Sequence, residues 1–340
     1  MDPPPRPNPV DWPSGLDRDG WTGAELTKTR VAVDLDDEQR DALRRRVAEI
    51  GAAGLPLHAV THARFAHPAL DPAMHRVALQ LKQGTGLVFL RGLPVVGCDS
   101  AALRLMFWGL STYFGLAVSQ SGRGDRLGEV VAGPDAGPRG YTSDRALHFH
   151  NDLAEIFGLF CIERARTGGE TLFASMLRAH RILERAHPEH LPVLARGFRL
   201  DRTPDSPHFA AEPFSPYPIP LFSTLAGLRS CWLTLPERAL RCARSLGLEL
   251  GRTELAALEA LQSIIEAPGF AFQALLEPGE AVFVNNYEIV HARTGFVQHD
   301  DPARRRHLLR IWLQDIPPRP MVPELALYRN PSGRQGIDPV

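Results

Sequence analysis

The stretch "LHFHND" at residues 147–152 carries two histidines and an aspartate at alternate positions, His148, His150 and Asp152. In a β-strand, side chains two residues apart point to the same face, so this strand would present imidazoles and a carboxylate together. Two histidines and one carboxylate on one side of a metal ion leave three coordination positions open, which is typical of non-haem Fe(II) sites. The stretch therefore predicts a strand and a candidate metal site, with an ordinary hydrogen-bonded His–Asp pair as the alternative.

A third ligand is offered by the stretch "GEAVFVNNYEIVHARTGF" at 279–296. Residues 281–285 have strand character, and His291 follows after a short polar turn. A histidine so far downstream of His150 and Asp152 fits a jelly roll, in which strands distant in sequence meet in one barrel. The alternative is that His291 is an ordinary buried histidine.

The stretch "RRRHLLRIWL" at 304–313 places positive charge on one face of a strand. Arg304, Arg306 and Arg310 share that face, and Trp312 continues it. Arginines are not buried in a barrel without an anionic partner. A carboxylate would suit them, since a guanidinium binds it through two parallel hydrogen bonds. The alternative leaves this face in solvent, although Trp312 argues against full exposure.

Short strand-like runs bounded by Gly and Pro dominate the chain, with helices between them. We expect helices at 34–54, 70–83, 100–115, 176–187, 235–246 and 253–266. We expect strands at 86–94, 128–131, 146–150, 156–163, 170–174, 198–203, 219–225, 228–234, 270–275, 280–285 and 306–315. This pattern predicts a mainly β fold with α, in which a double-stranded β-helix (jelly-roll) core is flanked by helices.

The composition indicates one domain and excludes some partners. The 340 residues are 44% hydrophobic, enough for a substantial core. We expect a proline-rich, poorly ordered arm over 1–30 and a single domain over 31–340. With 38 basic and 39 acidic residues, nothing indicates a nucleic-acid groove, and no apolar run approaches the roughly 20 residues of a membrane span. Four cysteines without a C-x-x-C predict reduced thiols in a cytoplasmic protein.

The order of these motifs is more specific than any one of them. An H-x-D, a GG-x-T segment, a distal His and an R-x-x-x-R strand follow one another along the chain. In this order the sequence resembles the taurine dioxygenase-like (TauD/TfdA) family of Fe(II)/2-oxoglutarate-dependent oxygenases over about residues 84–315. The matching stretches are "FHND" (149–152), "GLFCIERARTGGETLFASM" (158–176), "VNNYEIVHARTGF" (284–296) and "RRHLLRIWL" (305–313).

The resemblance assigns roles to the metal-binding residues. It implies iron ligation by His150, Asp152 and His291, and it selects His150 over His148 as the first ligand. Retention of Asp152 argues against the halogenase variant, in which loss of the carboxylate opens a site for chloride. The cofactors implied are Fe(II), 2-oxoglutarate as co-substrate, and O₂.

The resemblance also assigns the co-substrate contacts. Arg310 matches the arginine that grips the distal carboxylate of 2-oxoglutarate, and Thr171 matches the threonine that supports the same carboxylate. Arg306 matches the arginine near the C1 carboxylate. The sulfonate-binding set of the taurine enzyme is not reproduced, because Gln120 and Ala146 stand at two of its positions. A taurine substrate is therefore not predicted.

The activity implied is oxidation of an unactivated C–H bond of a small molecule, with release of succinate and CO₂. Hydroxylation is the default outcome, and desaturation or cyclisation in natural-product biosynthesis is the alternative on the same fold. Two alternatives come from other classes: a non-catalytic cupin-like metal-binding protein, and a Zn(II) hydrolase at the same three ligands. Arg306 and Arg310 argue against a mere scaffold. The family also suggests association into a homo-oligomer.

Several polar residues flank the metal-bearing segments and are candidates for substrate binding. They are Ser119, Gln120, Tyr141, Thr142 and Asn286. Each could equally make hydrogen bonds within the fold. The proline-rich run at 204–222 is either a lid over the site or a long surface loop.

Overall fold

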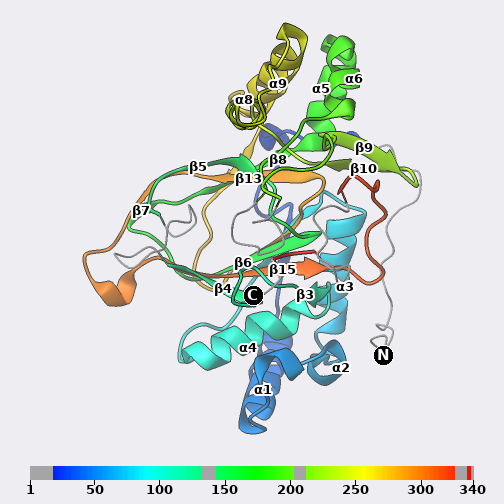
Figure 1. Ribbon diagram of the computed structural model, residues 1–340. Coiled ribbons are helices and arrows are strands. Elements are labelled where there is room, and N and C mark those ends of the chain that lie inside the picture. Colours follow the sequence, from blue (N-terminus) through cyan, green and yellow to red (C-terminus); the bar gives the residue numbers. More distant parts are fainter. Residues whose placement is uncertain (1–17, 132–142, 203–211, 326–334, 338–340) are drawn as a thin grey trace.

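The computed structural model describes residues 18–131, 143–202, 212–325 and 335–337. Its centre is a pair of β-sheets that lie across from each other (Figure 1). This arrangement confirms the predicted jelly roll with flanking helices.

The larger sheet has seven strands. Its order is β1 (Ala32–Asp34), β2 (Leu87–Arg91), β12 (Ala281–Asn285), β6 (Ile156–Glu163), β15 (His307–Gln314) and β3 (Leu116–Ala117), and β4 (Leu127–Val131) also pairs with β15. The smaller sheet has the order β11 (Phe272–Ala274), β8 (Thr171–Ser175), β13 (Ile289–Arg293) and β5 (Leu147–His150). Strands far apart in sequence are therefore neighbours in both sheets.

The central strands of the larger sheet are buried on both faces, and β15 shows why they read as nearly continuous apolar runs. Its Leu308 and Trp312 face the core cluster between the two sheets. Its Leu309 and Ile311 face a second cluster beneath the N-terminal helices. The predicted alternation along "RRRHLLRIWL" is thus confirmed, except that Arg304 belongs to a 3-10 turn before the strand.

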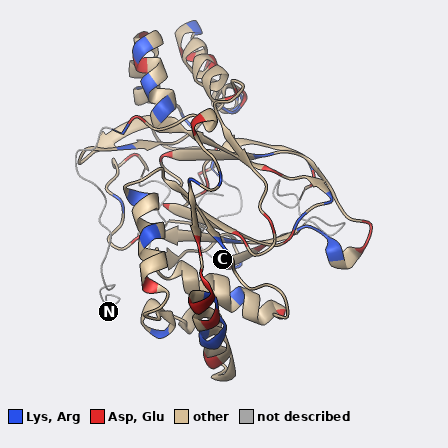
Figure 2. Ribbon diagram, turned by 180° about the vertical axis from the view of Figure 1, so that it is seen from behind, with Lys and Arg blue, Asp and Glu red and all other residues tan. Residues whose placement is uncertain are grey.

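Two groups of helices cover the sheets from opposite sides (Figure 1). One group consists of α1 (Asp37–Ala52), α2 (His62–Phe65), α3 (Asp71–Lys82) and α4 (Ser100–Ser111). The other consists of α5 (Met176–Ala186), α6 (Leu191–Arg196), α8 (Pro236–Ser245) and α9 (Arg252–Ile265). Acidic and basic residues are interspersed along these helices (Figure 2), in keeping with the near-zero net charge.

Four features differ from the sequence-based expectation. The expected strand at 198–203 appears in its described part only as isolated bridges from Phe198 and Asp201. The expected strands at 219–225 and 228–234 shorten to β9 (Phe222–Leu225) and β10 (Leu228–Cys231), which form their own hairpin. The short pair β7 (Thr167–Gly168) and β14 (Phe296–Val297) was not predicted. The strand β13 carries His291 after the expected polar turn, but its bounds were not predicted.

The arm expected over residues 1–30 does not extend through residues 18–30. Trp21 is 6% exposed, and its indole N–H donates to the carbonyl of Thr85. Arg18 forms an ion pair with Glu288, and Leu26 joins the core between the sheets. The buried indole explains why this stretch packs against the domain, since its apolar area is removed from water.

Two further expectations concern the chain as a whole. Cys98, Cys161, Cys231 and Cys242 are free thiols, as expected from their spacing. Within the described residues, no helix is both long and apolar enough to cross a bilayer.

Candidate active site

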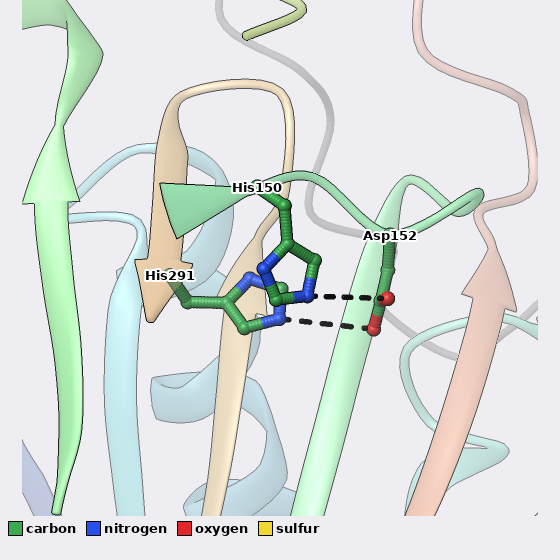
Figure 3. Close-up of side chains that lie close together, drawn as sticks. All are labelled: His150, Asp152 and His291. Atoms are coloured by element: carbon green, nitrogen blue, oxygen red, sulfur yellow. Dashed lines mark ion pairs between the residues drawn. The ribbon is translucent and has the colours of Figure 1, made fainter. Parts of the chain in front are cut away.

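The two histidines of the candidate triad are held opposite each other by sheet register. His150 ends β5, and the antiparallel ladder pairs it with His291 of β13. Their ring centroids lie 4.3 Å apart. Asp152 follows two residues after His150, in the loop that leads to β6, and its carboxylate faces both imidazoles (Figure 3). The register of one strand pair thus joins two motifs that are far apart in the sequence.

The ligand atoms of the triad converge closely enough for one metal ion. His150 Nε2 lies 4.0 Å from Asp152 Oδ1, and His291 Nε2 lies 3.9 Å from Asp152 Oδ2. One ligand atom from each residue lies within 4.8 Å of those of the other two. Imidazole nitrogens and a carboxylate oxygen are the donor set of a non-haem Fe(II) site, so the residues fit that metal.

The protonation states also suit a metal. Burial, together with the nearby His150, lowers the pKa of His291 to about 3, although Asp152 opposes the shift. A neutral imidazole is the form that binds metals. His150 Nδ1 lies 2.8 Å from the carbonyl of His148, and an N–H donated there leaves the Nε2 lone pair towards the site. His148 itself is exposed, in agreement with the prediction that it is not a ligand.

Asp152 remains ionised despite its burial. Desolvation acts to raise the pKa of this carboxyl, but Arg310, His291, His150 and a hydrogen bond from Trp312 outweigh it, so the pKa lies below its usual range. Trp312 Nε1 donates to Asp152 Oδ2 at 2.7 Å. The carboxyl of Asp152 is therefore an anion over the neutral range of pH.

The triad lines a pocket between the two sheets that encloses about 480 Å³, its open mouth included. The other described residues of its wall are Val130, Leu147, Phe157, Leu159, Thr171, Ala292, Arg293, Arg306 and Arg310. The structure thus brings Thr171 and both sequence-predicted arginines to the same pocket as the metal-binding residues. Its size, and a wall that combines apolar side chains with charged and polar groups, suit a small molecule.

The two arginines occupy different ends of this pocket. Arg310 is at the metal end, where its Nη1 lies 3.9 Å from Asp152 Oδ1. Arg306 precedes it by four residues, which is roughly 13 Å along an extended chain. A Cβ at Gly169 would lie 3.2 Å from Arg306 Nε, so Arg306 is next to the segment that carries Thr171. Arg310 therefore lies nearer to Asp152, and Arg306 nearer to the segment of Thr171.

Arg306 is a buried cation that needs an anion. It is 5% exposed and stacks on Phe296, with 5.0 Å between the guanidinium carbon and the ring centre. Burial, reinforced by the nearby Arg293, lowers its pKa to about 10. Among the described residues no acidic side chain forms an ion pair with it. A carboxylate ligand would supply the missing charge.

Two of the expected substrate-binding residues are used within the protein instead, which corrects that expectation. Gln120 is 2% exposed; its Oε1 accepts from Arg310 Nε at 2.7 Å, and its Nε2 donates to the carbonyls of Arg310 and Arg126. Asn286 is fully buried, and its amide is bonded to the backbone of Asp152 and Ala154.

Of the other three expected substrate-binding residues, the structure describes only Ser119. Ser119 donates to the carbonyl of Ser121 and is not among the described residues of the pocket wall. Tyr141 and Thr142 lie outside the described residues, as do 204–211 of the expected lid.

Three residues of the site were not singled out from the sequence. Arg293 lines the pocket from β13, and its Nη2 donates to the carbonyls of Ser143 and Arg145. Its position two residues after His291 was the available signal, since both then face the same way. Phe157 stacks on the ring of His291 at 4.0 Å between centroids. The third, Trp312, was noted only as a buried neighbour and not as a partner of Asp152.

Comparison with known proteins shows a family match and two relatives that are similar in sequence. The family model "Taurine catabolism dioxygenase TauD, TfdA family" matches residues 44–312. The chain is 31% identical over 260 residues to "FR-33289 synthase" of Streptomyces rubellomurinus, covering 74% of this chain and 75% of that protein. It is 25% identical over 298 residues to "Taurine hydroxylase-like protein SAT17" of Stachybotrys chartarum, covering 79% and 73%.

Solved structures share the fold at lower identity. Asparagine oxygenase in complex with Fe(II), 3-hydroxyasparagine and succinate matches with a TM-score of 0.64 at 19% identity, covering 92% of this chain and 100% of that chain. The non-haem iron oxygenase OrfP in complex with Fe and α-ketoglutaric acid matches with a TM-score of 0.66 at 14% identity, covering 90% and 98%.

Proposed function

Because the chain belongs to the taurine catabolism dioxygenase (TauD/TfdA) family and is an Fe(II)/2-oxoglutarate-dependent dioxygenase, we propose that His150, Asp152 and His291 are its iron ligands. The observation that carries this assignment is the convergence of their ligand atoms at one end of a pocket that also holds three buried arginines, Arg293, Arg306 and Arg310. When bound, Fe(II) supplies activation of O₂, with 2-oxoglutarate converted to succinate and CO₂ while a substrate C–H bond is oxidised.

The co-substrate is proposed to lie along the pocket from the metal towards Arg306. Its distal carboxylate then meets Arg306 and Thr171, and Arg310 faces the anionic oxygens beside the metal. Three observations support this direction. Arg310 lies close to Asp152, and Arg306 lies beside Gly169. Thr171 pairs with Arg293, which is two residues further along β13 than His291. The proposal exchanges the roles that the sequence suggested for the two arginines.

The remaining pocket residues exclude water and fix orientation. Phe157 and Leu159 are two residues apart on β6, and both side chains line the pocket. They form an apolar wall beside His291, on whose ring Phe157 stacks. An apolar wall strengthens the attraction between Arg306 and a bound carboxylate, because little water competes there.

The substrate is proposed to be a small molecule that is hydroxylated on the way to a natural product. The pocket volume suits a small ligand, and a relative named as a synthase of one compound, FR-33289, supports a role in forming a compound. Desaturation or cyclisation uses the same residues and differs only in how the substrate lies. A taurine substrate is not proposed, since Gln120 is committed to Arg310.

Anaerobic titration tests the proposed iron ligands. Fe(II) with 2-oxoglutarate should give a charge-transfer absorption band in the wild type. Most Fe(II) affinity in this titration, and all turnover in an aerobic assay, should be lost in His150→Ala, Asp152→Ala and His291→Ala. His148 is on the same strand as His150 but exposed, so His148→Ala should retain both. Full iron binding by His291→Ala would overturn the assignment. A Zn(II) hydrolase would show no absorption that depends on 2-oxoglutarate.

A further inference from the structure

The two histidines and the aspartate are held in different ways. Sheet hydrogen bonds fix His150 and His291, which pair with each other across β5 and β13. Asp152 lies outside any strand, in the loop of residues 151–155 before β6. A loop carboxylate needs other contacts to stay within reach of a metal, because small displacements of a ligand weaken binding strongly. The loop is nevertheless buried, with Asp152 7% and Ala154 0% exposed.

The backbone of Asp152 is held by the side chain of Asn286. The N–H of Asp152 donates to Asn286 Oδ1 at 3.1 Å, and Asn286 Nδ2 donates to the carbonyls of Asp152 at 2.6 Å and Ala154 at 2.7 Å. The N–H of Asn286 donates in turn to the carbonyl of Glu155 at 2.9 Å. Only an amide side chain offers one acceptor and two donors at this length, so one residue satisfies three backbone groups of the loop.

Asn151 fastens the same loop from its other side. Its Nδ2 donates to the carbonyl of Asn286, and its Oδ1 accepts from the N–H of Leu233 at 2.8 Å. The loop is therefore tied to the turn between β12 and β13, which also leads to His291. This connection sets the position of Asp152 relative to His291 through a single short segment.

The carboxylate of Asp152 is held by Trp312. The indole N–H donates to Oδ2 at 2.7 Å, and the indole ring carries the guanidinium of Arg310 over its face at 4.8 Å. A hydrogen bond to Oδ2 makes that oxygen the weaker donor towards a cation. Oδ1, which faces His150 and Arg310, is then left as the metal-binding oxygen.

We propose that Asn286 and Trp312 are positioning residues that present Asp152 to the metal as a ligand through one oxygen, Asn286 by its backbone and Trp312 by its carboxylate. Ligation through one oxygen keeps three positions open for a bidentate co-substrate and O₂. This inference rests on the proposed iron site, and it goes further by assigning functions to two side chains that are neither ligands nor substrate contacts.

The test compares two adjacent asparagines. Asn285 and Asn286 are both fully buried, but Asn285 Nδ2 donates to the carbonyl of Leu81 at 3.3 Å, away from the metal. Asn285→Ala and Asn286→Ala remove the same atoms and add no charge. The unfolding temperature of each variant is measured first. Fe(II) affinity and the charge-transfer band of the Fe(II)–2-oxoglutarate complex are then measured at a temperature where both variants are folded.

Asn286→Ala should weaken Fe(II) binding by about ten- to a hundredfold, as is typical when an outer partner of a metal ligand is lost. It should also shift or broaden the charge-transfer band. Asn285→Ala should lower the unfolding temperature and leave both metal readouts as in the wild type. Equal losses of stability and of Fe(II) affinity in the two variants would show that Asn286 serves the fold alone and would overturn its role.

Trp312→Phe keeps the ring beneath Arg310 and removes only the N–H. It should weaken Fe(II) binding by about tenfold, because the carboxylate loses the partner that orients it. It should also move the charge-transfer band, because Oδ2 becomes free to reach the metal. This variant keeps the proposal testable if Asn286→Ala does not fold. Wild-type affinity and an unchanged band in Trp312→Phe would refute it. Full Fe(II) binding by His291→Ala, in contrast, would refute the iron site itself, so the two failures are distinguishable.

Discussion

At the scale of single residues, Arg306 and Arg310 lie four residues apart and are proposed to contact opposite ends of the co-substrate. Both are buried and line the pocket, Arg310 from β15 and Arg306 from the residue directly before this strand. Four residues of extended chain separate the metal end from the far end of a small co-substrate. Their roles therefore follow from which one lies beside Asp152, and the structure gives that position to Arg310.

We predict that Arg306→Ala raises the dissociation constant for 2-oxoglutarate by roughly two to three powers of ten. A buried carboxylate left without its charged partner costs about 3–5 kcal/mol. Arg306→Lys should recover only part of this loss, because an ammonium cannot form two parallel hydrogen bonds. Anaerobic titration of the charge-transfer band measures the constant. Normal binding by Arg306→Ala, with a large loss in Arg310→Ala, would restore the order suggested by the sequence.

Thr171 tests the same end of the pocket with a smaller change. Thr171→Val keeps the shape of a residue that is 3% exposed and removes one hydroxyl. Loss of a hydrogen bond to a charged group should weaken 2-oxoglutarate binding by about 1.5–3 kcal/mol, while Fe(II) affinity without co-substrate stays the same. The same titration reports both quantities. An unchanged co-substrate affinity would place the distal carboxylate elsewhere.

At the scale of elements, an acidic residue attaches α8 to the segment at 198–202. Asp201 Oδ1 accepts from Arg238 Nε at 2.6 Å, and Oδ2 accepts from Arg241 Nη2 at 3.0 Å. Burial acts to raise the pKa of Asp201, but the charges and hydrogen bonds of Arg238 and Arg241 outweigh it and place the pKa below its usual range. The folded state therefore prefers the ionised carboxylate.

This shift predicts a dependence of stability on pH. Because the pKa is lower in the folded state, the contribution of Asp201 is complete above about pH 4, the ordinary value, and is lost as pH falls through the folded value. Thermal unfolding of the wild type and Asp201→Asn should differ most near pH 6 and converge below pH 4. A difference that stays constant down to pH 3 would contradict the ion pair as its source.

At the scale of the whole molecule, a buried cluster of charged side chains connects the N-terminal segment and the segment after β15 to the candidate active site. Glu288, in the turn before His291, pairs with Arg18 and with Arg319, whose Nη2 lies 3.1 Å from Glu288 Oε1. Glu155, in the loop that carries Asp152, accepts from the N–H of Arg319 at 3.1 Å. The segment after β15 thus packs against the loop that carries Asp152 and against the turn that leads to His291.

We predict that Arg319→Met destabilises the fold by about 3–5 kcal/mol, because it leaves Glu288 buried without its full complement of charge. Glu288→Gln combined with Arg319→Met should be less destabilised than the sum of the two single variants, since the double variant removes both charges. Denaturant unfolding of the four proteins gives the coupling energy. Simple additivity would mean that the pair does not act as a unit.

The sequence by itself determined most of the elements and singled out the three residues that are proposed to bind the metal. The strand at 156–163 and the helices at 176–187 and 253–266 were predicted closely, because their periodicity and their bounding Gly, Pro and capping residues are local signals. The three proposed metal ligands, which the structure brings together, also stand in short motifs, since ligand chemistry restricts which side chains can serve. Alternation along β15 predicted that Arg310 faces inward for the same reason, because the two-residue period of a strand is local.

Tertiary structure alone decided what the polar neighbours do. Gln120 and Asn286 looked equally suited to a substrate, yet one amide holds Arg310 and the other holds the loop of Asp152. The order of Arg306 and Arg310 along the pocket likewise depends on where β5 lies relative to β15. The hydrogen bonds of Asp152 with Asn286 and Trp312 join segments that are more than a hundred residues apart in sequence. Only the packing of the sheets brings these side chains together.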